Sequence, residues 1–167
     1  MSHPPRVGEI LIRRAKRSEL GAVARMAAAL VREHHALDSR RFMLVEPVET
    51  GYRAWLDREI ARRGAVILVA EDDEIEIVGY VYGTLEPRNW NDLLDTSGKV
   101  HDLYVARQAR HRGIGRRLMQ AMLFELKALG APRVVLMTAE GNRTALSFFA
   151  SIGFRRTMVE MTRELDE

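Results

Sequence analysis

Two glycines and a group of arginines lie where an apolar, strand-like run gives way to an amphipathic helical pattern, in the stretch Arg110-His111-Arg112-Gly113-Ile114-Gly115-Arg116-Arg117. The first N–H groups of a helix have no partner within the helix and carry partial positive charge. Glycine has no Cβ, so a ligand oxygen can approach the backbone closely there. The stretch therefore predicts a binding site for a phosphate group.

The spacing of these residues narrows the kind of phosphate ligand. A Walker A loop requires G-x-x-x-x-G-K-[ST], and a dinucleotide fingerprint requires G-x-G-x-x-G, whose third glycine position is Leu118 here. The pattern present is R-x-x-G-x-G, formed by Arg110, Gly113 and Gly115. Basic residues gathered on one loop favour a compact polyanion over a long duplex. A basic helix start with a flexible turn and no ligand is the alternative interpretation.

Composition sets the general class of protein. A chain of 167 residues fits one domain, 1–167, with a substantial core. The absence of cysteine excludes disulfides and thiolate chemistry, and no residue spacing suggests a metal site. No apolar run approaches the roughly 20 residues of a membrane span, and no signal peptide is recognisable. We therefore expect a cytoplasmic protein without a membrane partner. The net charge of +3 does not require a nucleic-acid partner, and we expect none.

Hydrophobic periodicity predicts alternating strands and helices. Apolar runs rich in β-branched residues predict strands at 9–14, 65–70, 75–85, 99–105, 132–138 and 155–165, and a polar hairpin turn at 71–74. Helical spacing predicts helices at 18–37, 49–63, 113–129 and 142–151. Gly79 and Gly83, inside one expected strand, indicate a bulge or a close approach. The order is β-α-α-β-β-β-α-β-α-β, which predicts an α/β or mixed α+β fold with helices covering a sheet.

Two sequence blocks resemble the GNAT superfamily of acyl-CoA-dependent N-acetyltransferases. The first is L-Y-V-x-x-x-x-R-x-x-G-x-G, from Leu103 to Gly115. The second is N-x-x-A-x-x-[FL]-[YF]-x-x-x-G-F, from Asn142 to Phe154. One helix and one strand separate the blocks, as in that family. The resemblance implies a central twisted mixed sheet of about six to seven strands flanked by about four helices, with acetyl-CoA as cosubstrate.

The resemblance also implies which residues bind the cosubstrate. The backbone of Leu103 and Val105 would pair with the pantetheine arm, and N–H groups from 111 to 116 would hold the pyrophosphate, with Arg110 and Arg116 or Arg117 reaching its oxygens. Asn142 would hydrogen-bond near the acetyl end, or only cap a helix. The full set of expected cosubstrate-binding residues is Leu103, Tyr104, Val105, Arg110, His111, Arg112, Gly113, Ile114, Gly115, Arg116, Asn142, Ala145, Phe148 and Phe149.

Phe149 departs from the family pattern. Many members have a tyrosine there, whose phenol protonates the departing CoA thiolate. Phe149 has no proton to donate. Either another group, such as Tyr104, is the acid, or the thiolate leaves to solvent.

Acetylation of an amine by direct attack in a ternary complex requires a base, because an amine with a pKa near 10.4 is mostly protonated at neutral pH. Strand alternation predicts Asp102 and Tyr104 on one face, and His101, Leu103 and Val105 on the other. His101 and Asp102 are the leading bases, and Glu86 is a third. Each also has a purely structural interpretation. The N–H of Val105 would polarise the acetyl carbonyl.

Three functions remain open from the sequence. An N-acetyltransferase acting on a small cationic amine or a peptide amine leads. A catalytically silent CoA-binding sensor module is favoured by Phe149, and a nucleic-acid-binding domain by the arginine cluster. Pairing of the expected strand 155–165 across a homodimer is possible but unsupported by any motif.

Overall fold

The computed structural model describes residues 9–73 and 76–165. The helices are α1 (Leu20–Leu37), α2 (Val48–Glu59), α3 (Ile114–Ala128) and α4 (Arg143–Ser151), with short 3-10 turns η1 (Arg17–Glu19) and η2 (Arg107–Ala109). The strands are β1 (Leu11–Arg14), β2 (Ala65–Glu71), β3 (Ile77–Glu86), β4 (Ser97–Val105) and β5 (Val134–Leu136). The expected α/β order is confirmed through α4. The expected turn at 71–74 lies partly outside the described residues.

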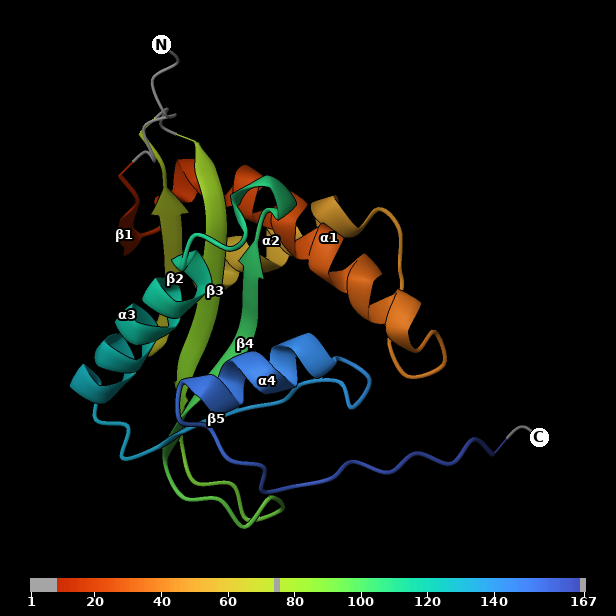
Figure 1. The fold of residues 1–167 in the computed structure, drawn as a ribbon. Helices are drawn as coiled ribbons and strands as arrows, with labels where there is room; N and C mark the ends of the chain where they lie inside the picture. The colour runs from red at the N-terminus through yellow and green to blue at the C-terminus, as the bar shows by residue number, and fades with distance from the viewer. Residues whose placement is uncertain (1–8, 74–75, 166–167) are drawn as a thin grey trace.

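Helices lie on both faces of the sheet (Figure 1), and an apolar core fills the space on each face. Helices α1 and α2 cover one face, where Leu20, Leu56 and Tyr80 are fully buried. Helices α3 and α4 cover the opposite face, where Leu118 and Met122 pack against strand residues and the aromatic side chains of α4 lie alongside. None of the helices in the described ranges has the length and apolarity required to cross a membrane.

The strand order is β1-β2-β3-β4-β5. The first four strands are antiparallel to their neighbours, and β5 is parallel to β4. The β4–β5 pairing is short, joining Gly98 to Val134, Lys99 to Val135 and Val100 to Leu136. Beyond Val100, no strand in the described part of the chain pairs with this edge of β4.

A β-bulge interrupts the β3–β4 ladder in the middle of β4. Tyr82 pairs with Asp102 but Gly83 pairs with Val100, so His101 is an extra residue. Gly83 also permits a close approach, because a Cβ there would lie 2.8 Å from the Met122 sulfur on α3. Both interpretations of an interior glycine are therefore confirmed at this position.

The expected strand at 155–165 is wrong. The segment from Arg155 to Leu165 forms no strand, and Met158, Val159, Met161 and Leu165 are all strongly exposed. A strand requires a partner edge, and β5 is only three residues long. Ion pairs of Arg40 and Arg41 with Glu164 and Glu160 instead hold the segment near the loop between α1 and α2. The described sheet therefore has five strands rather than six to seven.

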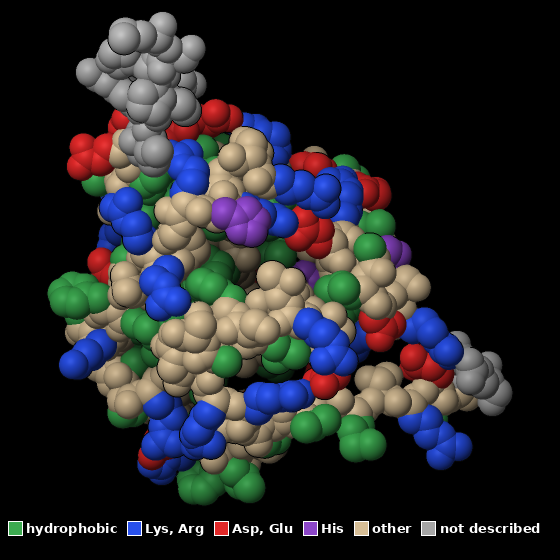
Figure 2. All heavy atoms as spheres, in the orientation of Figure 1, with side chains coloured by type: hydrophobic (Ala, Val, Ile, Leu, Met, Phe, Trp, Pro, Cys, Tyr) green, Lys and Arg blue, Asp and Glu red, His purple; other side chains and the backbone are tan. Residues whose placement is uncertain are grey.

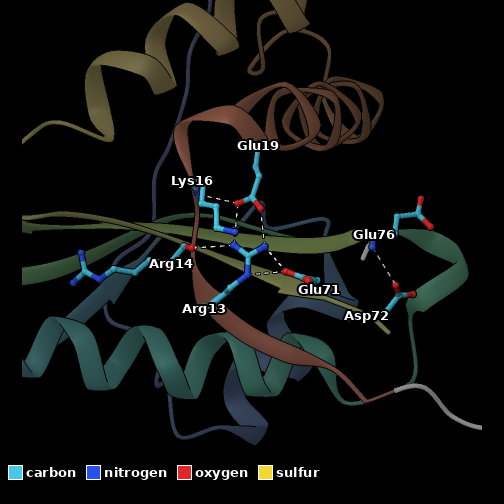
Figure 3. A network of polar contacts seen from close by, with 7 residues as sticks. All are labelled: Arg13, Arg14, Lys16, Glu19, Glu71, Asp72 and Glu76. Carbon is cyan, nitrogen blue, oxygen red and sulfur yellow. Dashed lines mark hydrogen bonds and ion pairs between the residues drawn. The ribbon is translucent and has the colours of Figure 1, made fainter. Parts of the chain in front are cut away.

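An ion network joins the outer strands to the start of α1 (Figure 3). The Arg13 guanidinium donates 2.6 and 2.9 Å hydrogen bonds to Glu19 and a 2.7 Å bond to Glu71. These side chains are about 80% buried, since their exposed fractions are 20%, 17% and 18%. The network fixes η1, and with it the direction in which α1 leaves β1.

Candidate active site

The N-terminus of helix α3 has no side-chain cap. Gly113 is its N-cap, with φ of 73°, a left-handed conformation that strongly favours glycine. Having no side chain, it cannot cap the N–H groups of the first turn, which lack partners within the helix. His111, with φ of 64°, makes the preceding turn. The structure therefore has a glycine turn and an uncapped helix start at this position, and binding of a phosphate there stays a prediction.

The arginines of this stretch point in different directions. Arg110 donates a 2.9 Å bond to the Val105 carbonyl and pairs with Glu33 at 3.3 Å. Arg116 contacts the Ser151 hydroxyl at 3.2 Å, which ties α3 to α4. Arg117 donates to the Ile10 carbonyl at 2.7 Å. That bond directs Arg117 toward the β1 end of the sheet, so we no longer expect it to contact a phosphate.

The open edge of β4 presents the backbone of Leu103 and Val105. The Gly98 N–H donates to Arg133 on the β5 side, whereas the Ala106 N–H donates to Val78 on the β3 side. Backbone groups alternate along a strand, so residues 98 and 106 would point to the same edge if the strand were regular. The bulge at His101 reverses this alternation. Leu103 and Val105 therefore turn their N–H and C=O groups to the open edge, as the Arg110 contact with the Val105 carbonyl also indicates.

Helix α4 lies beside this edge and the start of α3 (Figure 1). A Cβ on Gly115 would be 3.6 Å from the Phe148 ring, so α3 and α4 are in close contact. Phe149 meets Phe148 and Phe154 edge-to-face, with ring centroids 5.2 and 5.8 Å apart. The Asn142 Oδ1 accepts a 3.0 Å bond from the Ala145 N–H. Asn142 is therefore an N-cap, which leaves its amide nitrogen out of the capping bond.

The space-filling view shows a recess on this face, between the start of α3 and α4, with hydrophobic side chains at its floor (Figure 2). Lys and Arg side chains are spread over the same face, with Asp and Glu side chains between several of them. The basic residues do not form a continuous stripe in this view.

The prediction that His101 and Asp102 point to opposite faces is wrong. His101 stacks on Tyr82 with ring centroids 5.0 Å apart, and Asp102 bonds to Tyr80. Tyr80 and Tyr82 both belong to the face covered by α1 and α2. The bulge places two consecutive side chains on one face, an arrangement that simple alternation does not anticipate.

Asp102 is a carboxylate held by two phenols. Its Oδ2 accepts 3.0 Å hydrogen bonds from Tyr52 on α2 and from Tyr80 on β3. Burial raises the pKa of Asp102 above its ordinary value, although both phenol bonds act in the opposite direction. Burial and the nearby Asp102 charge raise the pKa of both tyrosines. Both phenols therefore stay protonated at neutral pH and can donate to the Asp102 carboxylate.

His101 is linked to Glu86 through Thr84. The His101 Nε2 lies 2.8 Å from the Thr84 hydroxyl, which donates a 2.5 Å bond to Glu86. Burial, followed by the positive charge of Lys99, lowers the pKa of His101. The imidazole is therefore neutral and able to accept a proton at neutral pH. Burial alone would raise the pKa of Glu86, but the Thr84 bond and the Arg62 ion pair at 3.2 Å hold it below its usual value.

Tyr104 lies on the face covered by α1 and α2, away from Phe149, which packs on the face covered by α3 and α4. The residue is 8% exposed, and its ring centroid lies 5.3 Å from the Arg110 guanidinium carbon. It also borders a hollow of about 550 Å³ beside α1. An acid role for Tyr104 stays a prediction.

Four residues of this cluster were missed by the sequence reasoning: Tyr52, Tyr80, Tyr82 and Thr84. Every second residue of β3 from position 80 to 86 belongs to this group: Tyr80, Tyr82, Thr84 and Glu86. Because side chains alternate between the two faces of a strand, this spacing of two could have predicted that they share a face. Tyr52 has no comparable signal, because its contact with Asp102 joins residues 50 positions apart.

Comparison with known proteins agrees with this geometry. The family model described as the acetyltransferase (GNAT) family matches residues 26–154. An L-methionine sulfoximine/L-methionine sulfone acetyltransferase of Pseudomonas aeruginosa is 34% identical over 111 residues, covering 65% of this chain and 61% of that protein. A mycothiol acetyltransferase of Rhodococcus opacus is 28% identical over 112 residues, covering 62% of this chain and 36% of that protein. The matches thus span less than two thirds of these relatives.

Solved structures share the fold. The BH1408 protein of Bacillus halodurans, as a tetramutant, has a TM-score of 0.82 at 24% identity, over 93% of this chain and 99% of that one. An aminoglycoside N-acetyltransferase in complex with CoA has a TM-score of 0.75 at 16% identity, over 98% of this chain and 99% of that one. The bulged β4, the glycine start of α3 and the family match over most of the chain lead to one assignment: the chain belongs to the acetyltransferase (GNAT) family, whose cosubstrate is acetyl-CoA.

Proposed function

We propose that this protein transfers the acetyl group of acetyl-CoA to the primary amine of a small cationic molecule or a peptide. The observation that carries the proposal is the position of the open β4 edge beside the glycine start of α3. The pantetheine arm of acetyl-CoA is extended and carries two amides, which can pair with the open strand edge. The pyrophosphate of acetyl-CoA can bind the backbone N–H groups at the helix start.

The residues present fit acetyl-CoA. The Leu103 and Val105 backbone groups would bind the pantetheine amides, and the first turn of α3, from Ile114 to Arg116, would hold the pyrophosphate. Phe148, which lies beside Gly115, and Phe149 are partly buried and supply apolar surface near the start of α3. Arg112 and His111 lie in the turn before the helix, where Arg112 would contribute positive charge and both residues backbone donors.

The chemistry uses His101 as the base. The amine nitrogen attacks the thioester carbonyl carbon, and the C–S bond then breaks to release the CoA thiolate. The proton lost by the amine passes to the neutral His101 imidazole, directly or through water. The Val105 N–H, turned to the open edge, would stabilise the oxyanion. Because thiolates are good leaving groups, Phe149 is compatible with departure of the sulfur to solvent.

Asp102 is the second candidate base, but its contacts favour a positioning role. Both phenols that bond to it have raised pKa values and remain donors. These bonds occupy Oδ2 and stabilise the carboxylate, whereas His101 retains one ring nitrogen outside the Thr84 contact. Glu86 is paired with Arg62 and Thr84, which makes it a weaker base still.

The test is turnover with a panel of amines. Purified protein, acetyl-CoA and amino acids, amino sugars, polyamines and short peptides are combined, and thiol release and product mass are followed together. We expect saturable thiol release accompanied by the mass gain of one acetyl group on one class of amine. A His101→Gln protein serves as the control for uncatalysed acetylation.

A catalytically silent CoA-binding module is the second candidate, and Phe149 is the observation that favours it. That alternative predicts acetyl-CoA binding without turnover on any amine. Saturable turnover would exclude it.

A further inference from the structure

Thr84 connects the candidate base to a carboxylate that the proposed chemistry does not otherwise use. Its side chain is fully buried, and it is one of two buried polar residues in the described chain, together with Ser97. A buried hydroxyl requires partners, and Thr84 has two, His101 and Glu86. The bulge makes this possible, because His101 has no register partner of its own on β3 and its side chain is directed toward Thr84.

The contacts close into a ring around His101. Thr84 donates a hydrogen bond to Glu86, and Glu86 forms an ion pair with Arg62 at 3.2 Å. Arg62 also forms an ion pair with Glu59 at 3.3 Å. Glu59 accepts a hydrogen bond from the Tyr82 hydroxyl, and the Tyr82 ring stacks on the His101 ring at an interplanar angle of 23°. The imidazole is therefore held at its face by Tyr82 and at one nitrogen by Thr84.

The direction of the hydrogen bonds follows from proton counting. A threonine hydroxyl has one proton to donate, and an ionised carboxylate can only accept. The Arg62 ion pair keeps Glu86 ionised, so Thr84 donates to Glu86. The Thr84 oxygen must then accept from His101, which places the ring proton on Nε2. In neutral His101 the lone pair is therefore on Nδ1.

We propose that Thr84 is a positioning residue that, with Glu86 behind it, fixes His101 in the Nε2–H tautomer and so makes Nδ1 the atom that accepts the amine proton. The tautomer is a property of the protein alone, whereas its use in catalysis rests on the proposed function. When the amine N–H bond breaks, an Nδ1–H bond forms. The resulting imidazolium keeps its Nε2–H on Thr84, with the Glu86 charge behind it.

The first test measures the tautomer directly and requires no activity. Long-range ¹H–¹⁵N spectra of ¹⁵N-labelled protein at about pH 8, above the ordinary histidine pKa of about 6.5, distinguish protonated from lone-pair nitrogens. The His101 signals are assigned by their absence in His101→Gln. We expect a protonated Nε2 and a lone pair on Nδ1. A protonated Nδ1, or a mixture of the two tautomers in rapid exchange, would overturn the proposal.

The second test asks whether the contact of Thr84 with His101 and Glu86, called the Thr84 relay below, matters for turnover. Thr84→Val keeps the side-chain shape and removes the hydroxyl, whereas Thr84→Ser keeps the hydroxyl. Ser97→Ala is the matched control, because it removes the other buried hydroxyl. We expect Thr84→Val to lose the tautomer preference. Its kcat should fall about tenfold or more, because the variant loses part of the rate enhancement that a general base supplies. The KM for acetyl-CoA should not change. Thr84→Ser should retain both properties, and Ser97→Ala should keep the tautomer and kcat.

The outcomes separate the two claims. A fixed Nε2–H tautomer in a protein without turnover on any amine would support the relay and count against the proposed function. Turnover that is unaffected by Thr84→Val, with the tautomer preference also unchanged, would refute the relay and leave the proposed function in place.

Discussion

His101 and Asp102 are neighbours in β4, yet both side chains contact tyrosines on the same face of the sheet, Tyr82 and Tyr80 respectively. The bulge that produces this also turns the Leu103 and Val105 backbone toward the open edge. One extra residue therefore brings the two candidate bases to one face and exposes the hydrogen-bonding edge of β4. A regular β4 would achieve neither.

His101→Gln should lower kcat by about 10²-fold or more, the typical contribution of a general base. Asp102→Asn should lower it by less than about tenfold, because the amide oxygen can still accept from Tyr52 or Tyr80. A base acts when deprotonated, so wild-type kcat should rise with pH through the His101 pKa and then level off. Burial lowers that pKa, which places the rise below about 6.5. Steady-state kinetics across pH checks this. Loss of the rise in Asp102→Asn and its retention in His101→Gln would make Asp102 the base.

Asp102→Asn should also stabilise the protein at neutral pH. Burial raises the pKa of Asp102 in the folded state above its unfolded value. The wild type therefore loses stability as pH rises through the folded pKa, and it regains that stability below the unfolded pKa, where the carboxyl is neutral in both states. We expect a melting temperature about 2–4 °C higher for Asp102→Asn at pH 7, equivalent to roughly 1 kcal/mol. The gain should shrink as pH falls. A gain independent of pH, or a loss at pH 7, would contradict the account.

Glu19→Gln should weaken the Arg13 network with the opposite pH dependence. Hydrogen bonding to Arg13 lowers the pKa of Glu19, so the wild type gains stability above the unfolded pKa and loses it as pH falls through the folded pKa. At pH 7 we expect a melting temperature lower by about 2–4 °C, or roughly 1 kcal/mol. Asp57→Asn is the matched control, because its Arg17 pair is 56% and 42% exposed. An equal effect in both variants would show that burial of the network is unimportant.

Much of the fold could be predicted from sequence because its elements have strong local signals. The stripe from Ile114 to Leu126 predicts α3, and the glycine at its start predicts the exposed N-terminus. The His101 bulge could not be placed, because register depends on pairing with β3 and on the packing of Met122 against Gly83. The segment 155–165 has strand-like residues, but propensity does not supply a partner edge. Thr84 was overlooked because its role depends on two residues that only the bulge brings together.

The central claim is that acetyl-CoA binds where α3 begins beside the open edge of β4. Gly115 tests it well: a Cβ there makes only ordinary contacts, and an acid in the first turn of a helix is favourable to the fold. The same acid would repel a pyrophosphate. Gly51→Glu, on the exposed surface of α2, is the matched control.

Isothermal titration calorimetry with acetyl-CoA is the most direct measurement. We predict saturable binding by the wild type and by Gly51→Glu, and an affinity at least about tenfold weaker, about 1.4 kcal/mol, for a folded Gly115→Glu protein. No binding by the wild type at millimolar acetyl-CoA, or equal affinity in the Gly115→Glu protein, would contradict the account.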